Sequence, residues 1–428
     1  MAMGSGAVLA NRLALWLSWP AIIGEFAPCP LLGESPAHSS ASSRPDDTRP
    51  VADIRGPFSE SVRGCMGDHE RIGISVSGGL DSLAVLIEAA RIADQDGRHI
   101  IAVMAEMTDD AGLSNVSVVR HILAASGLGN IELHITAARE TPTSEPDWHP
   151  EGPNLAALPS VKRSLLEKAA DHGATVAIGG SGADELLGTV RYMFGAFTTA
   201  GDWRALRSYW SDTIGEDRQA IPGEGLALAT RLLPRAWRSH LYFATEWPEL
   251  SVQKVPEIVS AAHRDHVASW SAQWITKVLK HHATRHKTWA QMAAWDAVFP
   301  LHLPPEPGPV PLKHPFLTPS FVAAAQRLPL ARRYDPTLPH AYWRQKAAVI
   351  SLIPKTMRAI LPTAKQTFRN DLASRYLAGK SDAANLIACG VVDEKAWMAT
   401  SDPSLVNRVN ALESWIREAD HRGYSIRS

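Results

Sequence analysis

Apolar positions recur with two different periods between residues 51 and 188 of this chain. Short apolar runs have the pattern of buried strands at residues 72–76, 99–105, 131–135 and 175–178. Other stretches are predicted to be helices, at residues 51–67, 83–90, 115–126 and 159–172. This alternation is typical of an α/β fold, in which a parallel sheet carries helices on both faces. In such sheets ligands bind beyond the carboxyl ends of the strands.

The remaining sequence divides into smaller parts. Residues 1–35 form a short apolar segment that is too small to fold alone, so we expect it to pack on the main body. Residues 36–50 are rich in Ser, Pro and Asp and are predicted to be a linker. The main domain is then expected to cover residues 51–428, with an amphipathic helix near residues 405–416.

Residues 189–310 are predicted to be a largely helical part of that domain. Eight of the 14 tryptophans lie between Trp203 and Trp295, and helix packing is their simplest use. A wall for a bulky, partly apolar acceptor is the alternative. His282 and His286 stand one helical turn apart in a basic run. Without a third ligand nearby, this pair indicates a solvated helix face more than a metal site.

The overall charge and the cysteines exclude several classes of partner. The net charge is −1, which gives no attraction toward nucleic acid or an anionic membrane, so we expect neither. No run approaches the ~18 apolar residues of a membrane span. The three cysteines are far apart and fit reduced thiols, which indicates a cytoplasmic protein.

The first candidate site follows the strand at residues 72–76. Ser77, Gly78 and Gly79 form a turn before the next helix, whose N-terminal backbone amides favour an anion. Asp81 adds a carboxylate there, and a carboxylate beside phosphates usually requires Mg²⁺ between them. The alternative is that this turn binds no ligand and only connects the strand to the helix.

A second glycine-rich turn follows the strand at residues 175–178. It contains Gly179, Gly180 and Ser181 and is followed by Asp184 and Glu185. Because parallel strands end at one edge of a sheet, we expect Asp184 to lie near Asp81 and to share Mg²⁺ with it. Alternatively, these acidic residues only favour the first turn of a helix through its dipole.

Both loops resemble those of a known superfamily. The Ser-Gly-Gly-Leu-Asp-Ser run at 77–82 resembles the pyrophosphate (PP) loop of the ATP pyrophosphatases, which have an adenine nucleotide alpha hydrolase-like fold. The second loop resembles the second signature of the asparagine synthetase family, in its synthetase domain. Weaker matches to that family occur at residues 154–159, 314–318, 342–346, 353–354 and 365–368. The resemblance covers about residues 51–375.

The resemblance implies an enzyme that adenylates a carboxylate with ATP and Mg²⁺, after which an amine displaces AMP. The phosphates would be held by Ser77, Gly78, Gly79, Asp81, Ser82, Gly179 and Gly180, and the metal by Asp81 and Asp184. Val103 and Met104 would flank the adenine. Lys365 and Ser181 would be the catalytic residues, Lys365 by stabilising the anionic intermediates and Ser181 on the acceptor side of the reaction.

Several departures from the family concern the nitrogen source. Position 2 is Ala2, where glutamine-dependent members have a catalytic Cys, and about 70 residues precede the first loop. We therefore expect no working glutaminase domain. The Glu of the second signature is Ser181, the Asp of Pro-Phe-Leu-Asp is Thr318, and the upstream Glu falls near Pro311.

These departures resemble relatives that join a carboxylate to an amine of the same substrate, namely β-lactam synthetases and lasso-peptide cyclases. Our preferred hypothesis is a lasso-type macrocyclase that forms an isopeptide bond between an N-terminal amine and an Asp or Glu side chain. It implies a peptide substrate, and a leader-binding protein and a protease as partners. The alternatives are an asparagine synthetase that uses ammonia or a partner glutaminase, a β-lactam synthetase-like cyclase, a thiolase or tRNA modifier, and a non-catalytic binding subunit.

Overall fold

The computed structural model describes residues 7–18, 53–128, 130–136, 152–153, 159–218, 220–251, 254–298, 308–370, 377 and 379–427. The predicted linker at 36–50, most of the predicted appendage at 1–35, and nearly all of the 154–159 match lie outside these residues. No helix in the described part of the chain is long and apolar enough to cross a membrane.

A parallel sheet of five strands forms the centre of the first half of the chain, in the order β4-β3-β2-β5-β6. The strands are β2 (Arg71–Ser75), β3 (His99–Ala105), β4 (Glu132–Thr136), β5 (Val176–Ile178) and β6 (Leu312–Lys313). The first four confirm the predicted strands to within one residue at either end. The sequence pattern did not predict β6, because two residues are too few to show a period.

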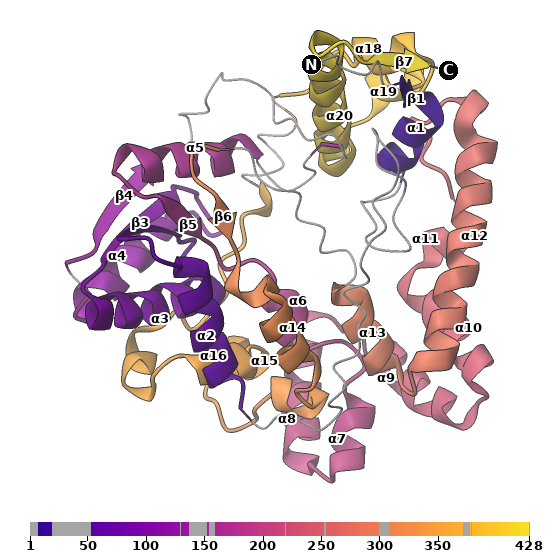
Figure 1. Cartoon of the computed structure of the whole chain (residues 1–428). Coiled ribbons are helices and arrows are strands. Elements are labelled where there is room, and N and C mark those ends of the chain that lie inside the picture. The colour runs from indigo at the N-terminus through magenta and orange to yellow at the C-terminus, as the bar shows by residue number, and fades with distance from the viewer. Residues whose placement is uncertain are drawn as a thin grey trace.

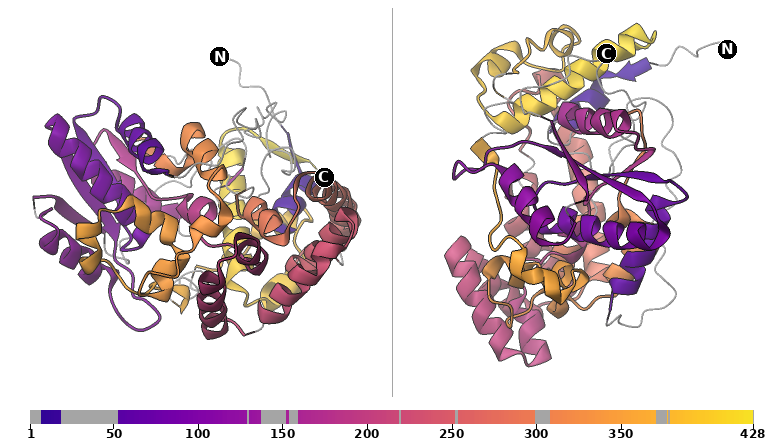
Figure 2. Two further views of the ribbon diagram at one scale, coloured as in Figure 1. Left: turned by 90° about the horizontal axis from the view of Figure 1, so that it is seen from below. Right: turned by 90° about the vertical axis from the view of Figure 1, so that its left-hand side faces the viewer.

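Helices cover both faces of this sheet, as the alternation of apolar side chains in β3 requires. Ala102 and Met104 belong to the core beneath α3 (Leu80–Asp96), with α2 (Arg55–Met66) and α4 (Asn115–Ala125) on the same side. Ile101 and Val103 face the opposite way, toward α5 (Pro159–Asp171). The right-hand view in Figure 2 shows the sheet between these two layers. The predicted α/β fold is confirmed.

The part at residues 189–310 is helical, as predicted, within the described residues. Its helices are α7 (Phe194–Ala200), α8 (Trp203–Glu216), α9 (Ala220–Ala229), η2 (Thr230–Leu232), α10 (Arg235–Glu246), α11 (Pro248–Ser251), α12 (Ala261–Arg285) and α13 (Trp289–Val298). Trp274 and Trp289 are buried, so packing accounts for them. Trp203 and Trp237 are instead 68% exposed. His282 is fully buried, which corrects the prediction of a solvated face at that position.

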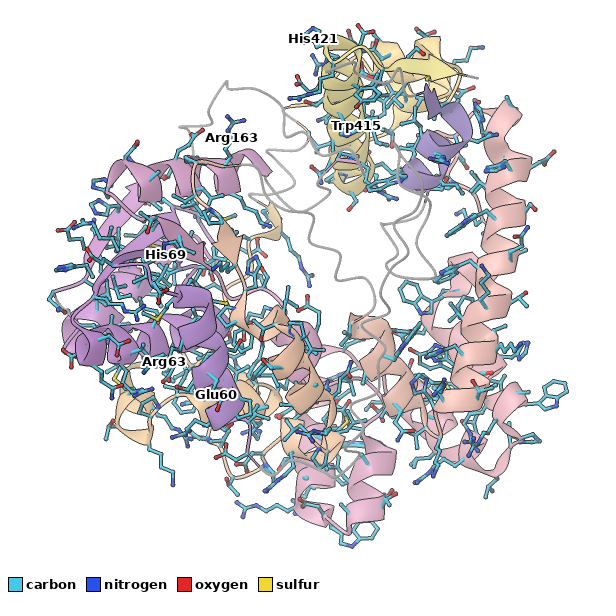
Figure 3. All side chains as sticks on the ribbon, viewed as in Figure 1. Glu60, Arg63, His69, Arg163, Trp415 and His421 are labelled. Atoms are coloured by element: carbon cyan, nitrogen blue, oxygen red, sulfur yellow. The ribbon has the colours of Figure 1, made fainter. Side chains whose placement is uncertain are left out.

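The two ends of the described chain lie together (Figure 1). β1 (Ala7–Leu9) pairs in parallel with β7 (Ser425–Arg427), and α1 (Ala10–Ser18) packs against α12 and α20 (Pro403–His421). Trp415 of α20, labelled in Figure 3, is fully buried in this core with Leu13 and Leu17 of α1. The N-terminal apolar residues that the structure describes therefore pack on the main body, as expected.

Shorter elements complete the path between β6 and α20. They are η3 (Pro315–Leu317), α14 (Pro319–Gln326), η4 (Leu330–Arg333), α15 (Ala341–Gln345), α16 (Ala347–Leu352), η5 (Lys355–Ile360), α18 (Ala384–Ala388) and α19 (Glu394–Ala399). The junction of α15 and α16 matters most for the site, because it places Lys346 beneath the carboxyl edge of the sheet.

Candidate functional site

The two glycine-rich loops meet where the chain changes direction across the sheet. From β2 the chain runs outward through β3 and β4, and it then returns to β5 on the other side of β2. The loops after β2 and β5 therefore adjoin at the switch point, where doubly wound sheets bind their ligands. Gly180 touches the first loop so closely that a Cβ there would lie 2.9 Å from the backbone nitrogen of Ser82.

The first loop is held by its own serines. The Oγ of Ser82 accepts from the backbone nitrogen of Ser77 at 3.1 Å and donates to the carbonyl of Gly79 at 3.1 Å. Gly78 has φ of +87°, a conformation that side chains with a Cβ rarely adopt. The 17-residue helix α3 starts after Gly79, which has no side chain to cap it. The amide of Leu80, at the start of this helix, donates to the hydroxyl of Tyr342 at 3.5 Å, and no N-cap side chain bonds to the amides that follow.

The second loop delivers carboxylates to the same edge. Gly182 has φ of +95°, and a Cβ there would overlap the side chain of Leu317. This turn starts α6 (Ala183–Leu187), whose first turn carries Asp184 and Glu185. Burial, followed by the negative charges of Asp184 and Asp81, raises the pKa of Glu185. The three carboxylates thus belong to one electrostatic cluster.

Asp81 and Asp184 are joined by one ammonium group, that of Lys346. Its Nζ donates to both carboxylate oxygens of Asp81, at 2.9 and 2.7 Å, and also contacts Oδ1 of Asp184. The Lys346 side chain is only 7% exposed. Burial lowers the pKa of Lys346, but the two carboxylates outweigh it and raise the pKa above its usual value. The ammonium therefore stays charged between them.

The two carboxylates differ in their surroundings. Burial raises the pKa of Asp81, and Lys346 only partly opposes this. Burial also acts to raise the pKa of Asp184, but Lys346 and Lys365 hold it below its ordinary value. A hard cation with oxygen ligands fits this donor set, because both carboxylates already reach a single positive charge. The residues present are therefore compatible with the predicted Mg²⁺ site.

Lys365 lies at the outer side of the same cluster. Its Nζ is 3.7 Å from Oδ2 of Asp184, and its side chain is 60% exposed. The adjoining Gln366 donates to Asp109 at 3.0 Å and lies beside Gly78 of the first loop. The backbone nitrogen of Asp110 also donates to the carbonyl of Thr367 at 2.8 Å. The segment that carries Lys365 is therefore anchored next to the loop while its ammonium remains accessible.

A cavity of about 270 Å³ opens beside the two loops. Its lining comprises Ser75, Ser77, Asp81, Ser82, Val103, Lys162, Leu165, Leu166, Ala177, Gly179, Gly180, Ser181, Leu312 and His314. Val103 and Ser181 are thus placed in it. Met104 is not among these residues, because it points to the opposite face of the sheet and is buried under α3. The adenine contact predicted for Met104 therefore finds no support at this cavity.

Lys346 is the site residue that sequence reasoning missed. It lay inside a matched segment, at residues 342–346, but received no role. A signal was present, since one lysine precedes the apolar run of α16. A buried lysine of this kind needs an acidic partner. The partner lies 265 residues away in the sequence, so only the fold identifies it as Asp81.

Comparisons with known proteins bear on the family of this chain. The family model for asparagine synthase matches residues 53–387. No curated protein matches the chain. Among solved structures, the chain is similar to the U34-tRNA thiolase NcsA from Methanococcus maripaludis with its 4Fe-4S cluster. That similarity has 13% identity and a TM-score of 0.24, and it covers 53% of this chain and 80% of the thiolase, which is too weak to bear on activity. From the family match, this chain belongs to the asparagine synthase family of ATP-dependent ligases.

Proposed function

We propose that this chain closes a ring in a peptide, by joining an Asp or Glu side chain to the N-terminal amine of the same peptide. The side-chain carboxylate attacks the α-phosphorus of ATP, and pyrophosphate leaves. The amine then attacks the acyl carbon of the adenylate, AMP leaves, and the amine loses one proton. One amide bond therefore forms for each ATP that is split to AMP and pyrophosphate, as in the lasso-type cyclases.

The two loops support the nucleotide half of this proposal. The amides at the start of α3 would receive the phosphates, since they lie at the positive end of the helix dipole. Mg²⁺ held by Asp81 and Asp184 would screen the charge between the substrate carboxylate and the triphosphate. The ammonium of Lys365, exposed beside Asp184, would stabilise the negative charge that develops at the α-phosphate. Val103 would contact the adenine from the cavity wall.

The lining of the cavity around Ser181 carries the acceptor half of the proposal. Asp81 is the only carboxylate among the described residues that line it, and Lys346 already binds both of its oxygens. Free ammonium would need a base to remove its proton, and Ser181, at the position of the family's Glu, supplies none. An N-terminal amine has a pKa of about 7.7–8.0, so much of it is neutral near pH 8. The cavity therefore favours an amine that the substrate itself carries.

The experiment offers ATP and Mg²⁺ with synthetic peptides that have a free N-terminus and one internal acidic residue. The expected product has lost one water and appears together with AMP, in mass spectrometry and nucleotide chromatography. Two matched peptides serve as controls, one N-acetylated and one with the acidic residue replaced by its amide. Neither should lose water.

An asparagine synthetase that uses ammonia is the competing function. It predicts asparagine from aspartate and ammonium, with AMP formed in equal amount. That product from the wild-type chain, with Ser181 in place and no water lost from any peptide, would refute the peptide proposal while leaving the family's ATP chemistry intact.

A further inference from the structure

Two histidines and a glutamate gather at the edge strand of the sheet, two strands away from the first nucleotide loop. Glu132 and His134 are two residues apart on β4, the edge strand, so their side chains lie on the same face of the sheet. In the strand register they lie opposite Ile101 and Val103, whose side chains face α5. His172 directly follows the last residue of α5 on that same face. The topology thus brings three potential ligands together from two elements.

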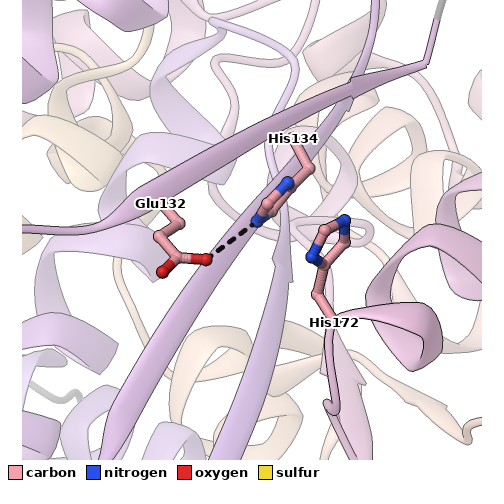
Figure 4. Close-up of side chains that lie close together, drawn as sticks. All are labelled: Glu132, His134 and His172. Atoms are coloured by element: carbon pink, nitrogen blue, oxygen red, sulfur yellow. Dashed lines mark hydrogen bonds and ion pairs between the residues drawn. The ribbon is translucent and has the colours of Figure 1, made fainter.

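The three side chains are close enough to share one ion (Figure 4). Nε2 of His134 lies 3.1 Å from Oε2 of Glu132. The rings of His134 and His172 are stacked, with centroids 3.4 Å apart and planes inclined by 20°. One ligand atom from each residue lies within 4.8 Å of the other two. Among the described residues, this is the one group of three metal-ligating side chains that meets that spacing.

We propose that Glu132, His134 and His172 bind a divalent transition metal, with Zn²⁺ as the expected ion. Two imidazoles and one carboxylate suit zinc, whereas Mg²⁺ prefers oxygen ligands alone. Neighbouring ligands around tetrahedral zinc lie about 3.4 Å apart, for bonds of about 2.0–2.2 Å. The three ligand atoms lie within 4.8 Å of one another, and Glu132 is free to rotate toward a shared ion because its side chain is 66% exposed. Water completes the coordination on the exposed side.

The position of the site indicates a structural role. The metal would tie the end of α5 to the edge strand, where the strand otherwise pairs on one side only. The main chain at His172 is already fixed, since its carbonyl accepts from Arg71 at 2.9 Å and Gly173 follows with φ of +81°. Leu165 and Leu166 of the same helix line the nucleotide cavity. The metal would therefore stabilise the helix layer that closes one side of that cavity.

The test measures metal binding by the full-length chain, without nucleotide. Zn²⁺ titration is followed by calorimetry, and Co²⁺ is used as a visible-absorbing substitute. We expect one equivalent of metal, bound at least about 10-fold more weakly after His134→Ala or His172→Ala, since loss of even an outer partner of a ligand costs 10–100-fold. His121→Ala is the matched control, because it removes an exposed histidine from α4. It should leave binding unchanged.

Two further measurements separate ligation from folding. Glu132→Gln alters an exposed side chain and should weaken Zn²⁺ binding with no change in circular dichroism. Saturating Zn²⁺ should raise the melting temperature of the wild type and of His121→Ala, but not of His172→Ala, because a ligand stabilises only a protein that binds it. No zinc site in the wild type, or a site that persists in both histidine variants, would overturn the proposal. Neither result depends on the peptide reaction.

Discussion

Glu224 in the helical half and the pair Asp81 and Asp184 at the sheet edge are carboxylates that are bound in opposite ways. In the helical half, Glu224 accepts from the backbone nitrogens of Tyr192 at 2.7 Å and Phe194 at 3.2 Å, and from the hydroxyl of Tyr209 at 2.8 Å. At the sheet edge, the partners of Asp81 and Asp184 among the described residues are ammonium groups. The first arrangement is saturated by neutral donors, whereas the second is a cluster of like charges held by cations.

Asp296, like Glu224, is bound by neutral donors, whereas Asp212, also in the helical half, is bound by the guanidinium of Arg344. Asp296 accepts from the hydroxyl of Tyr242 at 2.6 Å and from the indole of Trp247 at 3.0 Å, and it lies 3.1 Å from Nε2 of His282. Nδ1 of His282 in turn lies 2.9 Å from Nδ1 of His286. The histidine pair that the sequence singled out is thus part of a network around the buried Asp296, with His282 buried and His286 half-buried.

The difference distinguishes carboxylates that stabilise the fold from carboxylates that can bind a ligand. A carboxylate whose lone pairs are filled by neutral donors stabilises its surroundings and has little left for a ligand. A set of acids that repel one another gains most from an incoming cation or substrate. Perturbed carboxylates of the second kind are typical of functional sites. Substitutions in the two regions should therefore have effects of different kinds.

The largest effect is expected at the metal carboxylates. Asp81→Asn and Asp184→Asn should each lower ATP turnover by at least ~10²-fold, because each removes a charge that would hold Mg²⁺ against the leaving pyrophosphate. Pyrophosphate release measures this, with circular dichroism as the check on folding. Turnover that stays within about threefold of wild type in either variant would place the reaction elsewhere.

Lys365 should affect the chemical step more than binding. Lys365→Ala is expected to lower kcat by about 10²-fold and to change ATP affinity little, because its contact strengthens only as charge develops in the transition state. Single-turnover kinetics and an ATP titration separate the two quantities. A loss confined to ATP affinity would make Lys365 a ground-state phosphate ligand instead.

Lys346 combines the two kinds of effect. Lys346→Met leaves Asp81 and Asp184 facing each other without a cation, so we expect about 10-fold lower turnover and a loss of about 1–3 kcal/mol in unfolding free energy, less than for a fully buried pair because Asp184 is 52% exposed. Mg²⁺ with ATP should stabilise this variant more than the wild type. An equal shift of melting temperature in both proteins would contradict the premise that Mg²⁺ and the Lys346 ammonium act on the same pair of carboxylates, Asp81 and Asp184.

The sequence predicted the sheet edge well because its signals are local. Loop, strand and helix follow one another within a dozen residues around Gly78 and again around Gly180, so period and turn chemistry sufficed. It missed Lys346 and the cluster of Glu132, His134 and His172, because these form only when distant segments meet. Met104, which was assigned to the adenine, does not line the cavity for a related reason. Adjacent residues of a strand point to opposite faces, so Val103 and Met104 do not both reach one ligand.

The smallest effect on catalysis is expected in the saturated region. Glu224→Gln keeps the shape of the side chain but replaces one acceptor by an NH₂ group, which would then face the backbone nitrogen of Tyr192 or Phe194. Two donors that face each other in a buried site leave one unsatisfied, at a cost of about 1–3 kcal/mol in unfolding free energy. Urea unfolding should show this loss, while ATP turnover of the folded variant stays within about threefold of wild type, since no part of the proposed reaction touches Glu224. Turnover that falls as far as in Asp184→Asn, at unchanged stability, would mean that the helical half also contributes to the chemistry and that saturation by neutral donors does not distinguish the two regions.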